Sequence, residues 1–355
     1  FLPPKEEYFK LLNEVWSSKQ LTNDGQLHQK LEKKLAKYLG VKYLSLVNNG
    51  TMGLIIAQRA LGFKNEIITT PFSFIATSHS IIWNGLKPVF VDTDLNFGNL
   101  DPENVQNAIT DKTGGILGVH NYGVPENELK LKQIAKKNKI PLLYDAAPAF
   151  GVKKKGKSIL EYGDASVLSF HGTKVFTTGE GGAIITNKKK LKTKIDFIRN
   201  FNIVNQEKVN GIGTNGKMNE LESALGIIQL NYIDDIIRKR RIIYNLYLNE
   251  LSSLKRLRIP TLSKGIEYNY AYFPIFFIEG SKLRDFVLNK LKEQKIFCRK
   301  YWSPLITDHK IYSDYNLNDY KNAKSLSRSV LCLPIYFDLK SKEINKIINI
   351  IKSLL

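Results

Sequence analysis

A lysine inside a short, glycine-rich connection is the residue of this chain best placed to do chemistry. Lys174 ends the stretch Ser169–Lys174 (SFHGTK) and is followed closely by Thr178–Gly182 (TGEGG). The small and aromatic residues around it predict a partly desolvated amine, which loses its proton more readily. A neutral amine can condense with an aldehyde, which is how proteins hold pyridoxal phosphate (PLP). A surface lysine beside a glycine turn is the alternative, and Lys174 alone does not decide between the two.

A carboxylate follows a buried-strand pattern 29 residues before this lysine. Asp145 ends the apolar run that begins at Pro141. Ligands of open α/β sheets gather at the carboxyl ends of strands, and an acid there can keep a pyridine nitrogen protonated. Asp145 could instead cap the following turn. Its spacing from Lys174 corresponds to one strand–turn–strand excursion, so we expect both side chains in one pocket.

Two further turns carry residues that suit phosphate binding. Asn49-Gly50-Thr51 joins a strand pattern to an apolar helix, where free N–H groups and a hydroxyl form a phosphate seat. A plain N-cap would use the same residues. Asn215 begins the second turn, just before a long helical region, and by itself this turn indicates only a helix cap.

The elements that must position these residues alternate through the first half of the chain. Strand patterns occur at 42–47, 66–70, 88–92, 115–120, 141–145, 165–168 and 183–186, and helical patterns at 27–39, 52–61, 74–83 and 126–138. Strands separated by helices predict an α/β fold with a mainly parallel sheet covered on both faces.

The pattern changes after Gly182. A long helix is expected from about residue 218 to 250, and strand–helix–strand–helix patterns follow beyond Pro260. These patterns predict a smaller C-terminal α+β domain. We expect a large domain at residues 1–240, which includes the N-terminal segment and the long connecting helix, and a small domain at 241–355.

Composition restricts the class of protein. Of 355 residues, 43% are hydrophobic, which is an ordinary globular share. No apolar run approaches the roughly 18 residues of a membrane span, and the first residues do not form a signal-peptide pattern. The two cysteines, Cys298 and Cys332, are too few for a disulfide framework and lack metal-ligand spacing. We expect a cytoplasmic protein with no metal site and no membrane partner.

The net charge of +20 could indicate nucleic acid, a membrane surface or an anionic substrate. The basic residues are scattered, however, and the densest run, Arg238–Arg241, lies inside an amphipathic helical pattern. Solvated helix faces are therefore the preferred interpretation. No nucleic-acid partner is expected.

Together these stretches resemble the DegT/DnrJ/EryC1/StrS family of sugar aminotransferases, over nearly the whole chain from Trp16 to Pro334. The most specific parts are Asp145–Ala147 and Ser169–Gly182, in the order and spacing usual for the family. The resemblance implies a PLP-dependent transferase of fold type I (aspartate aminotransferase-like). It also implies a homodimer with shared active sites.

The resemblance gives a role to seven positions. Lys174 matches the lysine that binds PLP covalently and moves a proton between cofactor and sugar, and Asp145 matches the acid paired with the pyridine nitrogen. The other matches are Gly50, Thr51 and Ser169 for the cofactor phosphate, Phe74 for stacking on the pyridine ring, and Asn215 for the phosphate of the neighbouring subunit.

One position departs from the usual family pattern. The family usually has Gln or His three residues after the aspartate, facing the ring hydroxyl, and this chain has Pro148. Proline cannot donate that hydrogen bond, so water or another group serves the hydroxyl, or the contact is absent. Members with a similar proline act on dTDP-linked 6-deoxy-4-keto-hexoses, and the loop Arg299–Ile306 also looks like that branch. Lys174 argues against the branch that has His there and performs dehydration.

The activity implied is transfer of the amino group of L-glutamate to a keto-sugar on a nucleotide diphosphate, at C4 of dTDP-4-keto-6-deoxyglucose. Amination at C3 of the isomeric 3-keto sugar stays open. Two readings from other classes also stay open: a regulatory protein that binds PLP without turnover, and a basic nucleic-acid-binding protein.

Overall fold

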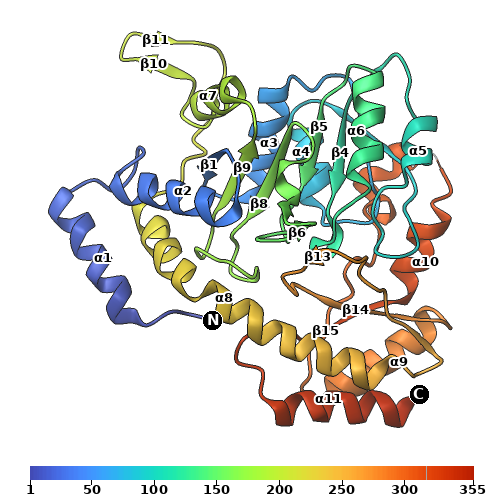
Figure 1. The fold of residues 1–355 in the computed structure, drawn as a ribbon. Helices are drawn as coiled ribbons and strands as arrows, with labels where there is room; N and C mark the ends of the chain where they lie inside the picture. Colours follow the sequence, from blue (N-terminus) through green and yellow to red (C-terminus); the bar gives the residue numbers. More distant parts are fainter. Residues whose placement is uncertain (317) are drawn as a thin grey trace.

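A seven-stranded sheet with helices packed on both faces forms the centre of the molecule (Figure 1). The computed structural model describes residues 1–316 and 318–355. The strand order is β1-β9-β8-β5-β4-β2-β3. The strands are β1 Tyr43–Val47, β2 Glu66–Thr69, β3 Lys87–Phe90, β4 Thr113–Val119, β5 Leu142–Asp145, β8 Ala165–Ser169 and β9 Gly182–Thr186.

Six of these strands run in one direction and β9 runs in the other. The pairs from β3 to β8 are all parallel, whereas β9 is antiparallel to both β1 and β8. The connection 170–181 contains no helix and turns the chain back, so that β9 returns antiparallel beside β8. The predicted mainly parallel sheet is confirmed, and Lys174 lies in the connection at which the direction changes.

Alternation of side chains along β9 buries both faces of the sheet. Ala183 and Ile185 belong to one apolar cluster, with residues of α2 Gln26–Leu39, while Ile184 belongs to another, with residues of α3 Gly50–Leu61. A strand buried on both faces reads as a continuous apolar run, which is the pattern seen in the sequence. The remaining helices of this part are α1 Lys5–Ser18, α4 Ala76–Trp83, α5 Pro102–Asn107, α6 Glu128–Lys137 and α7 Lys189–Ile198.

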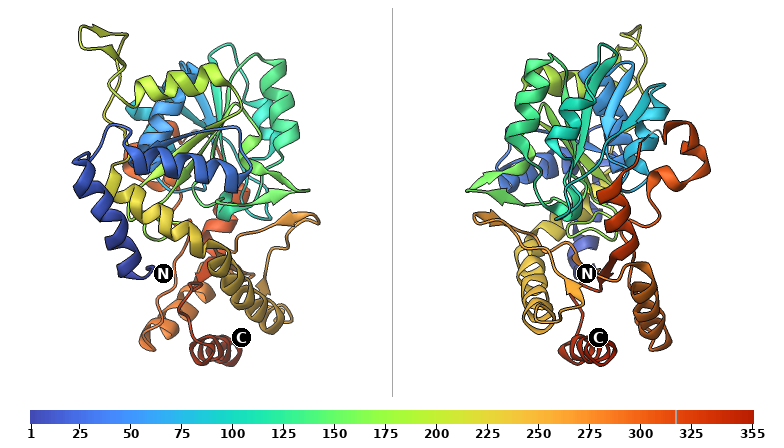
Figure 2. Two further views of the ribbon diagram at one scale, coloured as in Figure 1. Left: turned by 60° about the vertical axis from the view of Figure 1, so that its left-hand side comes forward. Right: turned by 90° about the vertical axis from the view of Figure 1, so that its right-hand side faces the viewer.

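The long helix α8, Glu220–Leu251, connects the large sheet to the C-terminal part (Figure 2). It contacts both α2 and the last helix, α11 Ser341–Leu354. A three-stranded sheet of order β12-β14-β15 forms the C-terminal part together with α9, α10 and α11. Their bounds are β12 Leu257–Arg258, β14 Phe273–Phe277, β15 Val330–Leu333, α9 Ser281–Glu293 and α10 Lys321–Ser329. The expected α+β region is present, and the domain boundary proposed at 240/241 falls inside α8.

Short strands complete the fold. β10 Ile203–Asn205 and β11 Lys208–Val209 form a hairpin that projects from the top of the molecule in Figure 1. The three-stranded sheet β13-β6-β7 joins Ile266–Glu267 to Lys153–Lys154 and Lys157–Ser158. The sequence patterns had not indicated these small elements.

One residue of the densest basic run is not on a solvated face. Arg240 is 8% exposed, and its Nη1 donates to the carbonyl oxygens of Tyr270 and Ala271. Burial lowers its pKa to about 10. The prediction of a solvated face is therefore wrong for Arg240, although Arg238 is exposed as expected.

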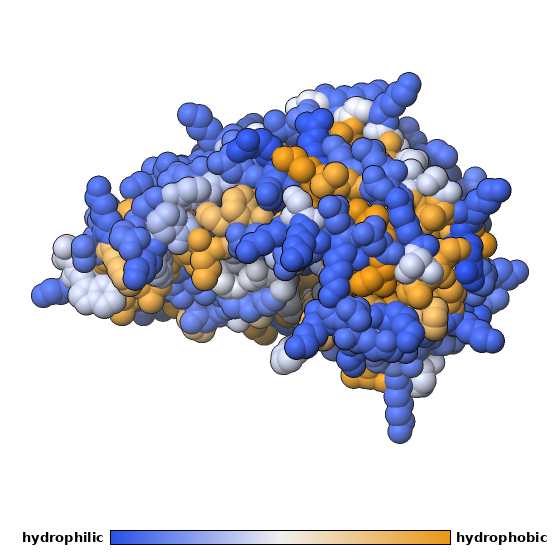
Figure 3. Space-filling model, turned by 90° about the horizontal axis from the view of Figure 1, so that it is seen from below, coloured by the Kyte–Doolittle hydropathy of each residue, from blue (hydrophilic) through white to orange (hydrophobic). Residues whose placement is uncertain are grey.

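Hydrophilic side chains cover most of the face seen from below, with separate apolar patches between them (Figure 3). Among the described residues, no helix combines the length and the apolar character needed to cross a membrane. The same part of the chain has no group of three or more His, Cys, Asp or Glu side chains able to hold a metal ion.

Candidate active site

A cavity of about 680 Å³ opens at the carboxyl ends of β5 and β8. Six of the seven predicted site residues line it: Gly50, Thr51, Phe74, Asp145, Ser169 and Lys174. Tyr272, Tyr301 and Trp302 add an aromatic wall from the C-terminal part of the chain. The edge of the sheet predicted from the strand patterns is therefore where the candidate residues meet.

Asp145 is a buried carboxylate at the end of β5. Its Oδ2 accepts a hydrogen bond from Thr77 Oγ1 at 2.7 Å, and its Oδ1 accepts one from the Ala147 amide at 3.1 Å. Burial raises the pKa of Asp145 above its ordinary value, while these two hydrogen bonds and the charge of Lys174 oppose the rise. A positive charge brought into the cavity beside this carboxylate would favour its ionised form.

Thr77, which donates to the cavity acid Asp145, is a site residue that sequence reasoning missed. It lies in the first turn of α4, and its hydroxyl also makes a 2.8 Å contact with Ser73 Oγ. One sequence signal could have identified it, because Thr77 follows the predicted cavity residue Phe74 by three positions. In the helix expected from about residue 74, this spacing would place both side chains on the same face, although the observed helix begins only at Ala76.

Lys174 lies on the connection between β8 and β9 and is half-buried. Its amide donates to the carbonyl oxygen of His171 at 2.9 Å, which closes a turn that carries the side chain into the cavity. In the same connection, Phe170 and Phe176 are fully buried and pack edge to face with ring centroids 4.9 Å apart. The partly desolvated amine expected at Lys174 stays a prediction.

The N-terminus of α3 forms a seat for an anion. The first amides of a helix have no partner within it, and the Asn49 side chain accepts a hydrogen bond from the Met52 amide. The amides of Gly50 and Thr51 remain for a ligand, with the hydroxyls of Thr51 and Ser169 beside them on the cavity wall. Such N–H groups bind phosphate, helped by the positive end of the helix dipole.

Two glycines allow the strands and the helix to approach this closely. A Cβ on Gly50 would lie 3.0 Å from Cβ of Ser169. A Cβ on Gly182, the first residue of β9, would lie 3.0 Å from the Gly50 nitrogen. The seat therefore depends on the absence of side chains at both positions. Its donors fit a phosphate group, and the acid at Asp145 fits a pyridine nitrogen, so the residues present fit PLP.

Phe74 and Trp302 lie at the mouth of the cavity, with ring centroids 5.8 Å apart. Phe74 is 56% exposed in the single chain. A hydrogen bond orients the Trp302 ring, because its Nε1 donates to Asn121 Oδ1 at 3.1 Å. The Asn121 amide nitrogen in turn donates to the carbonyl oxygens of Phe72 and Gly98. The large part of the chain thus orients a wall residue from the C-terminal part.

Pro148 also lines the cavity, where the family usually has a hydrogen-bonding side chain. Its carbonyl oxygen accepts from Asn269 Nδ2 at 2.8 Å, and the same amide nitrogen donates to the Phe150 carbonyl oxygen at 2.9 Å. The proline backbone is therefore anchored to the segment before β14.

Asn215 is the one predicted site residue that does not line the cavity. It is exposed, and its side-chain oxygen accepts from Lys217 Nζ at 2.8 Å. The resemblance had assigned it to the neighbouring subunit's phosphate, and its exposure is compatible with that assignment. Its role stays a prediction.

A mainly parallel sheet with one reversed strand, a lysine in the reversing connection, an acid at a strand end and a phosphate seat define a PLP-dependent transferase of fold type I. Residues 4–352 match the DegT/DnrJ/EryC1/StrS aminotransferase family, and the chain belongs to this family. The resemblance stated from the sequence motifs is confirmed.

Individual relatives agree with the family. The dTDP-4-amino-4,6-dideoxy-D-glucose transaminase of Shigella dysenteriae is 46% identical over 355 residues, which cover 99% of this chain and 97% of the relative. The structure of DesI with its TDP-sugar product has a TM-score of 0.94 at 29% identity and covers 99% of this chain and 90% of its own. NtdA of Bacillus subtilis, solved with bound PMP, has a TM-score of 0.91 at 28% identity and covers 98% of this chain and 81% of its own.

Proposed function

We propose that this aminotransferase uses PLP to move the amino group of L-glutamate to C4 of dTDP-4-keto-6-deoxyglucose. The observation that carries the proposal is the meeting of Lys174 and Asp145 in one cavity beside a phosphate seat. The sugar is suggested by the Shigella dysenteriae relative, whose name specifies a dTDP-linked 4-amino-4,6-dideoxyglucose. Amination at C3 of the 3-keto isomer is the alternative that the test below must exclude.

Each residue of the cavity has a distinct task in this proposal. Bound PLP would supply an electron sink and carry the amino group between the two substrates. The amine of Lys174 takes and returns the proton at the reacting carbon, which is general acid–base catalysis. Asp145 pairs with the pyridine nitrogen, and Thr77 holds its carboxylate in place. The amides of Gly50 and Thr51 and the hydroxyl of Ser169 bind the phosphate.

The aromatic walls suit the sugar half of the substrate. Phe74, Trp83, Tyr301 and Trp302 line the cavity with apolar surface, as ligand pockets commonly do. The resemblance to the family also implies that the Phe74 ring stacks on the cofactor ring. The net charge of +20 is compatible with a substrate that carries a diphosphate.

We further propose that the enzyme is a homodimer in which Asn215 completes the partner's phosphate site. Apolar side chains are exposed on the β10–β11 hairpin and next to it, including Val209 and Ile212, which is 79% exposed. Exposed apolar groups of this kind mark interaction surfaces. They lie in the same segment as Asn215, so a partner that covers them would also meet its side chain.

The reaction is tested by adding PLP to the purified protein and then L-glutamate while the visible spectrum is recorded. Conversion of the cofactor spectrum to that of the amine form, with release of 2-oxoglutarate, is expected. The converted enzyme is then given the 4-keto and the 3-keto isomer of the dTDP-sugar separately. An amino product from the 4-keto isomer supports the proposal, and one from the 3-keto isomer alone contradicts it. Bound PLP with no response to any amino donor would indicate a regulatory protein.

The shared site is tested by mixing two inactive variants, Lys174→Ala and Asn215→Asp, under conditions that exchange subunits. In a shared-site dimer the hybrid has one site with both defects and one with neither. Half of the dimers are hybrids at full exchange, so activity should return to about a quarter of wild type. The Asp variant places a negative charge near phosphate, which should weaken cofactor binding. Hybrids confirmed by mass spectrometry without recovered activity would place Asn215 in its own subunit's chemistry.

A further inference from the structure

A buried lysine contacts the side chain that is proposed to reach the partner. Lys217 is 9% exposed. Its Nζ donates to Asn215 Oδ1 at 2.8 Å and to Asn200 Oδ1 at 2.9 Å. The same ammonium lies 4.9 Å from the centre of the Phe201 ring, a cation–π contact. Lys217 therefore joins the two strands of a bridge between Asn200 and Asn215.

The chemistry of an ammonium determines how the Asn215 amide is oriented. Lysine Nζ has three donors and no acceptor, so an amide that faces it must present its oxygen. The Asn215 Nδ2 group then points away from Lys217, on a side chain that is exposed. An outward N–H group is what a phosphate oxygen requires, whereas an outward oxygen would repel it.

We propose that Lys217 is a positioning residue for cofactor binding, which holds Asn215 with its amide nitrogen facing the phosphate seat of the partner subunit. This inference rests on the shared site proposed above. Lys217 itself touches neither cofactor nor substrate in the proposal. It acts only through the orientation of Asn215.

The backbone around Asn215 is held on two sides. The Thr214 carbonyl oxygen accepts from the Phe201 amide at 3.0 Å, and the Gly216 amide donates to the Arg199 carbonyl oxygen at 2.8 Å. The Gly216 carbonyl oxygen accepts from the Asn48 amide at 2.9 Å. Asn48 directly precedes the phosphate seat of its own chain. A fixed backbone leaves the rotation of the Asn215 side chain as the freedom that Lys217 removes.

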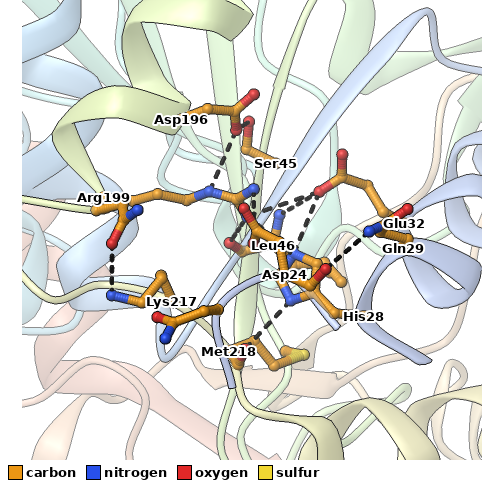
Figure 4. A network of polar contacts seen from close by, with 12 residues as sticks. Asp24, His28, Gln29, Glu32, Ser45, Leu46, Asp196, Arg199, Lys217 and Met218 are labelled. Atoms are coloured by element: carbon orange, nitrogen blue, oxygen red, sulfur yellow. Dashed lines mark hydrogen bonds and ion pairs between the residues drawn. The ribbon is translucent and has the colours of Figure 1, made fainter. Parts of the chain in front are cut away.

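A network of charged side chains anchors the buried Arg199, which begins this segment (Figure 4). Arg199 is 3% exposed. Its guanidinium lies 3.2 Å from oxygens of both Asp24 and Asp196 and 3.6 Å from Glu32, and it also donates to the Leu46 carbonyl oxygen. A planar guanidinium with several donors can serve all these acceptors at once. The network ties the segment to α2, β1 and α7.

The other end of the segment is anchored by α2. The Met218 carbonyl oxygen contacts His28 Nδ1 at 3.2 Å, as Figure 4 shows. The carboxylate of Glu220 accepts from the amides of Leu27 and His28 at 2.9 and 2.8 Å. These contacts fix the start of α8 against the start of α2, so residues 199 to 220 have a rigid frame at both ends.

Burying the charged amine of Lys217 costs free energy, and a residue that only filled space would not need that charge. Burial lowers the pKa of Lys217, partly opposed by the charge of Asp24 and reinforced by that of Arg199. A methionine or leucine of similar volume would avoid that cost. The hydrogen bonds to the two asparagines are therefore the physical reason for an ammonium at this position.

The test is a double-mutant cycle on the affinity of the dimeric apoenzyme for PLP, measured by absorbance titration. Asn215→Ala and Lys217→Met should each weaken PLP binding by about tenfold, the value of one hydrogen bond to a charged group. The double variant should bind no more weakly than Asn215→Ala alone, because the two side chains act as one unit. At saturating PLP, kcat of Lys217→Met should stay within about twofold of wild type.

Two further variants separate positioning from general damage. Lys217→Arg keeps donors without an acceptor and should retain PLP affinity within about threefold. Lys192→Met is the matched control, because Lys192 is a partly buried lysine of the same network that pairs with Glu32 and Asp196 but has no contact with Asn215. It should lower thermal stability and leave PLP affinity unchanged. If Lys217→Met does not fold, Lys217→Leu, which also has no donor, replaces it in the cycle.

The outcomes distinguish this inference from the proposal on which it rests. Independent effects that multiply in the double variant, or a Lys217→Met enzyme with unchanged PLP affinity, would overturn the role of Lys217 alone. An Asn215→Ala enzyme with unchanged PLP affinity would overturn the shared site, and this inference with it. Equal losses of affinity in Lys192→Met and Lys217→Met would show that Lys217 acts through the stability of the network.

Discussion

Two acids in this molecule, the buried Asp145 and the partly buried Glu32, have opposite surroundings. Asp145 faces the cavity, and Glu32 faces the charge network at the start of α2. Burial by itself raises the pKa of both groups. For Asp145 the rise persists, whereas for Glu32 a hydrogen bond with His28 and the charges of Lys192 and Arg199 lower the pKa to about 2.

The difference separates an acid that stabilises the fold from an acid that is available to a ligand. The protein itself supplies the cations beside Glu32, which are Lys192 and Arg199. The charge of Glu32 is therefore balanced without a ligand. Asp145 has hydrogen bonds from Thr77 and the Ala147 amide and only the partly buried amine of Lys174 as a nearby cation. A pyridinium would supply the missing charge. An acid that the fold leaves without a full partner is one that a ligand can complete.

The largest effect should follow from removing the amine in the cavity. Lys174→Ala should lower transamination by about 10⁴-fold, since it removes the group that moves the proton. PLP should still bind through the phosphate seat. Lys188→Ala is the control, because Lys188 is an exposed lysine paired with Asp164 outside the cavity. After borohydride reduction of the holoenzyme, peptide mapping should find the pyridoxyl group on Lys174, and a label on another lysine would remove it from this role.

The next largest effect tests the cavity acid. Asp145→Asn is nearly isosteric and should lower turnover by about 10²–10³-fold while the free energy of unfolding changes little. Asp164 provides the matched control, since it accepts from the Leu142 amide at the other end of β5. Asp164→Asn should reduce stability and leave turnover near wild type. Near-normal activity in Asp145→Asn would show that the Asp145 carboxylate is not needed for the reaction, so the proposed difference between Asp145 and Glu32 would be wrong.

Glu32→Gln tests the acid with built-in partners and should act on stability. The folded pKa of Glu32, about 2, is below the unfolded value of 4.5. Its contribution is therefore complete above pH 4.5 and is lost as the pH falls toward 2. A shift of this size corresponds to about 3 kcal/mol at pH 7. Denaturant unfolding should show that loss at neutral pH and a smaller one at pH 3, while PLP binding persists. Equal losses at both values would contradict the ionic explanation.

The smallest effect should come from Thr77→Val, which removes one hydrogen bond to Asp145. That bond lowers the pKa of Asp145, so its loss should raise the pKa and move the acid limb of the kcat/KM profile to higher pH. A fall of about tenfold is expected on the acid side, with recovery at higher pH. Thr77→Ser keeps the hydroxyl and serves as control. A uniform fall at every pH would indicate a packing defect instead.

The sequence predicted the parts of the fold and site that depend on local patterns. The apolar run before Asp145 and the small-residue connection around Lys174 each identify a strand end, and parallel strands bring such ends to one edge. The long helix was expected from about residue 218 to 250 and spans Glu220–Leu251. Helix α4 was expected from Phe74 but begins at Ala76, so Phe74 precedes the helix.

What escaped prediction depends on contacts between distant residues. The charge network joins Asp24 and Glu32 to Asp196 and Arg199, which are more than 160 positions away. Nothing in a local pattern distinguishes Arg199 from a solvated arginine, and Arg240 was misread for the same reason. Both are buried because distant segments supply their acceptors. The shared phosphate site needs residues of two chains, so the structure of one chain does not test it. It stays a prediction.

The pairing of β1 has a consequence for the growing chain on the ribosome. β1 pairs with β9, whose last residue, Thr186, is made about 140 residues after the end of β1. At synthesis rates of about 5–20 residues per second, this apolar edge waits on the order of ten seconds for its partner. We expect residues 1–47 to remain unfolded or chaperone-bound during that time.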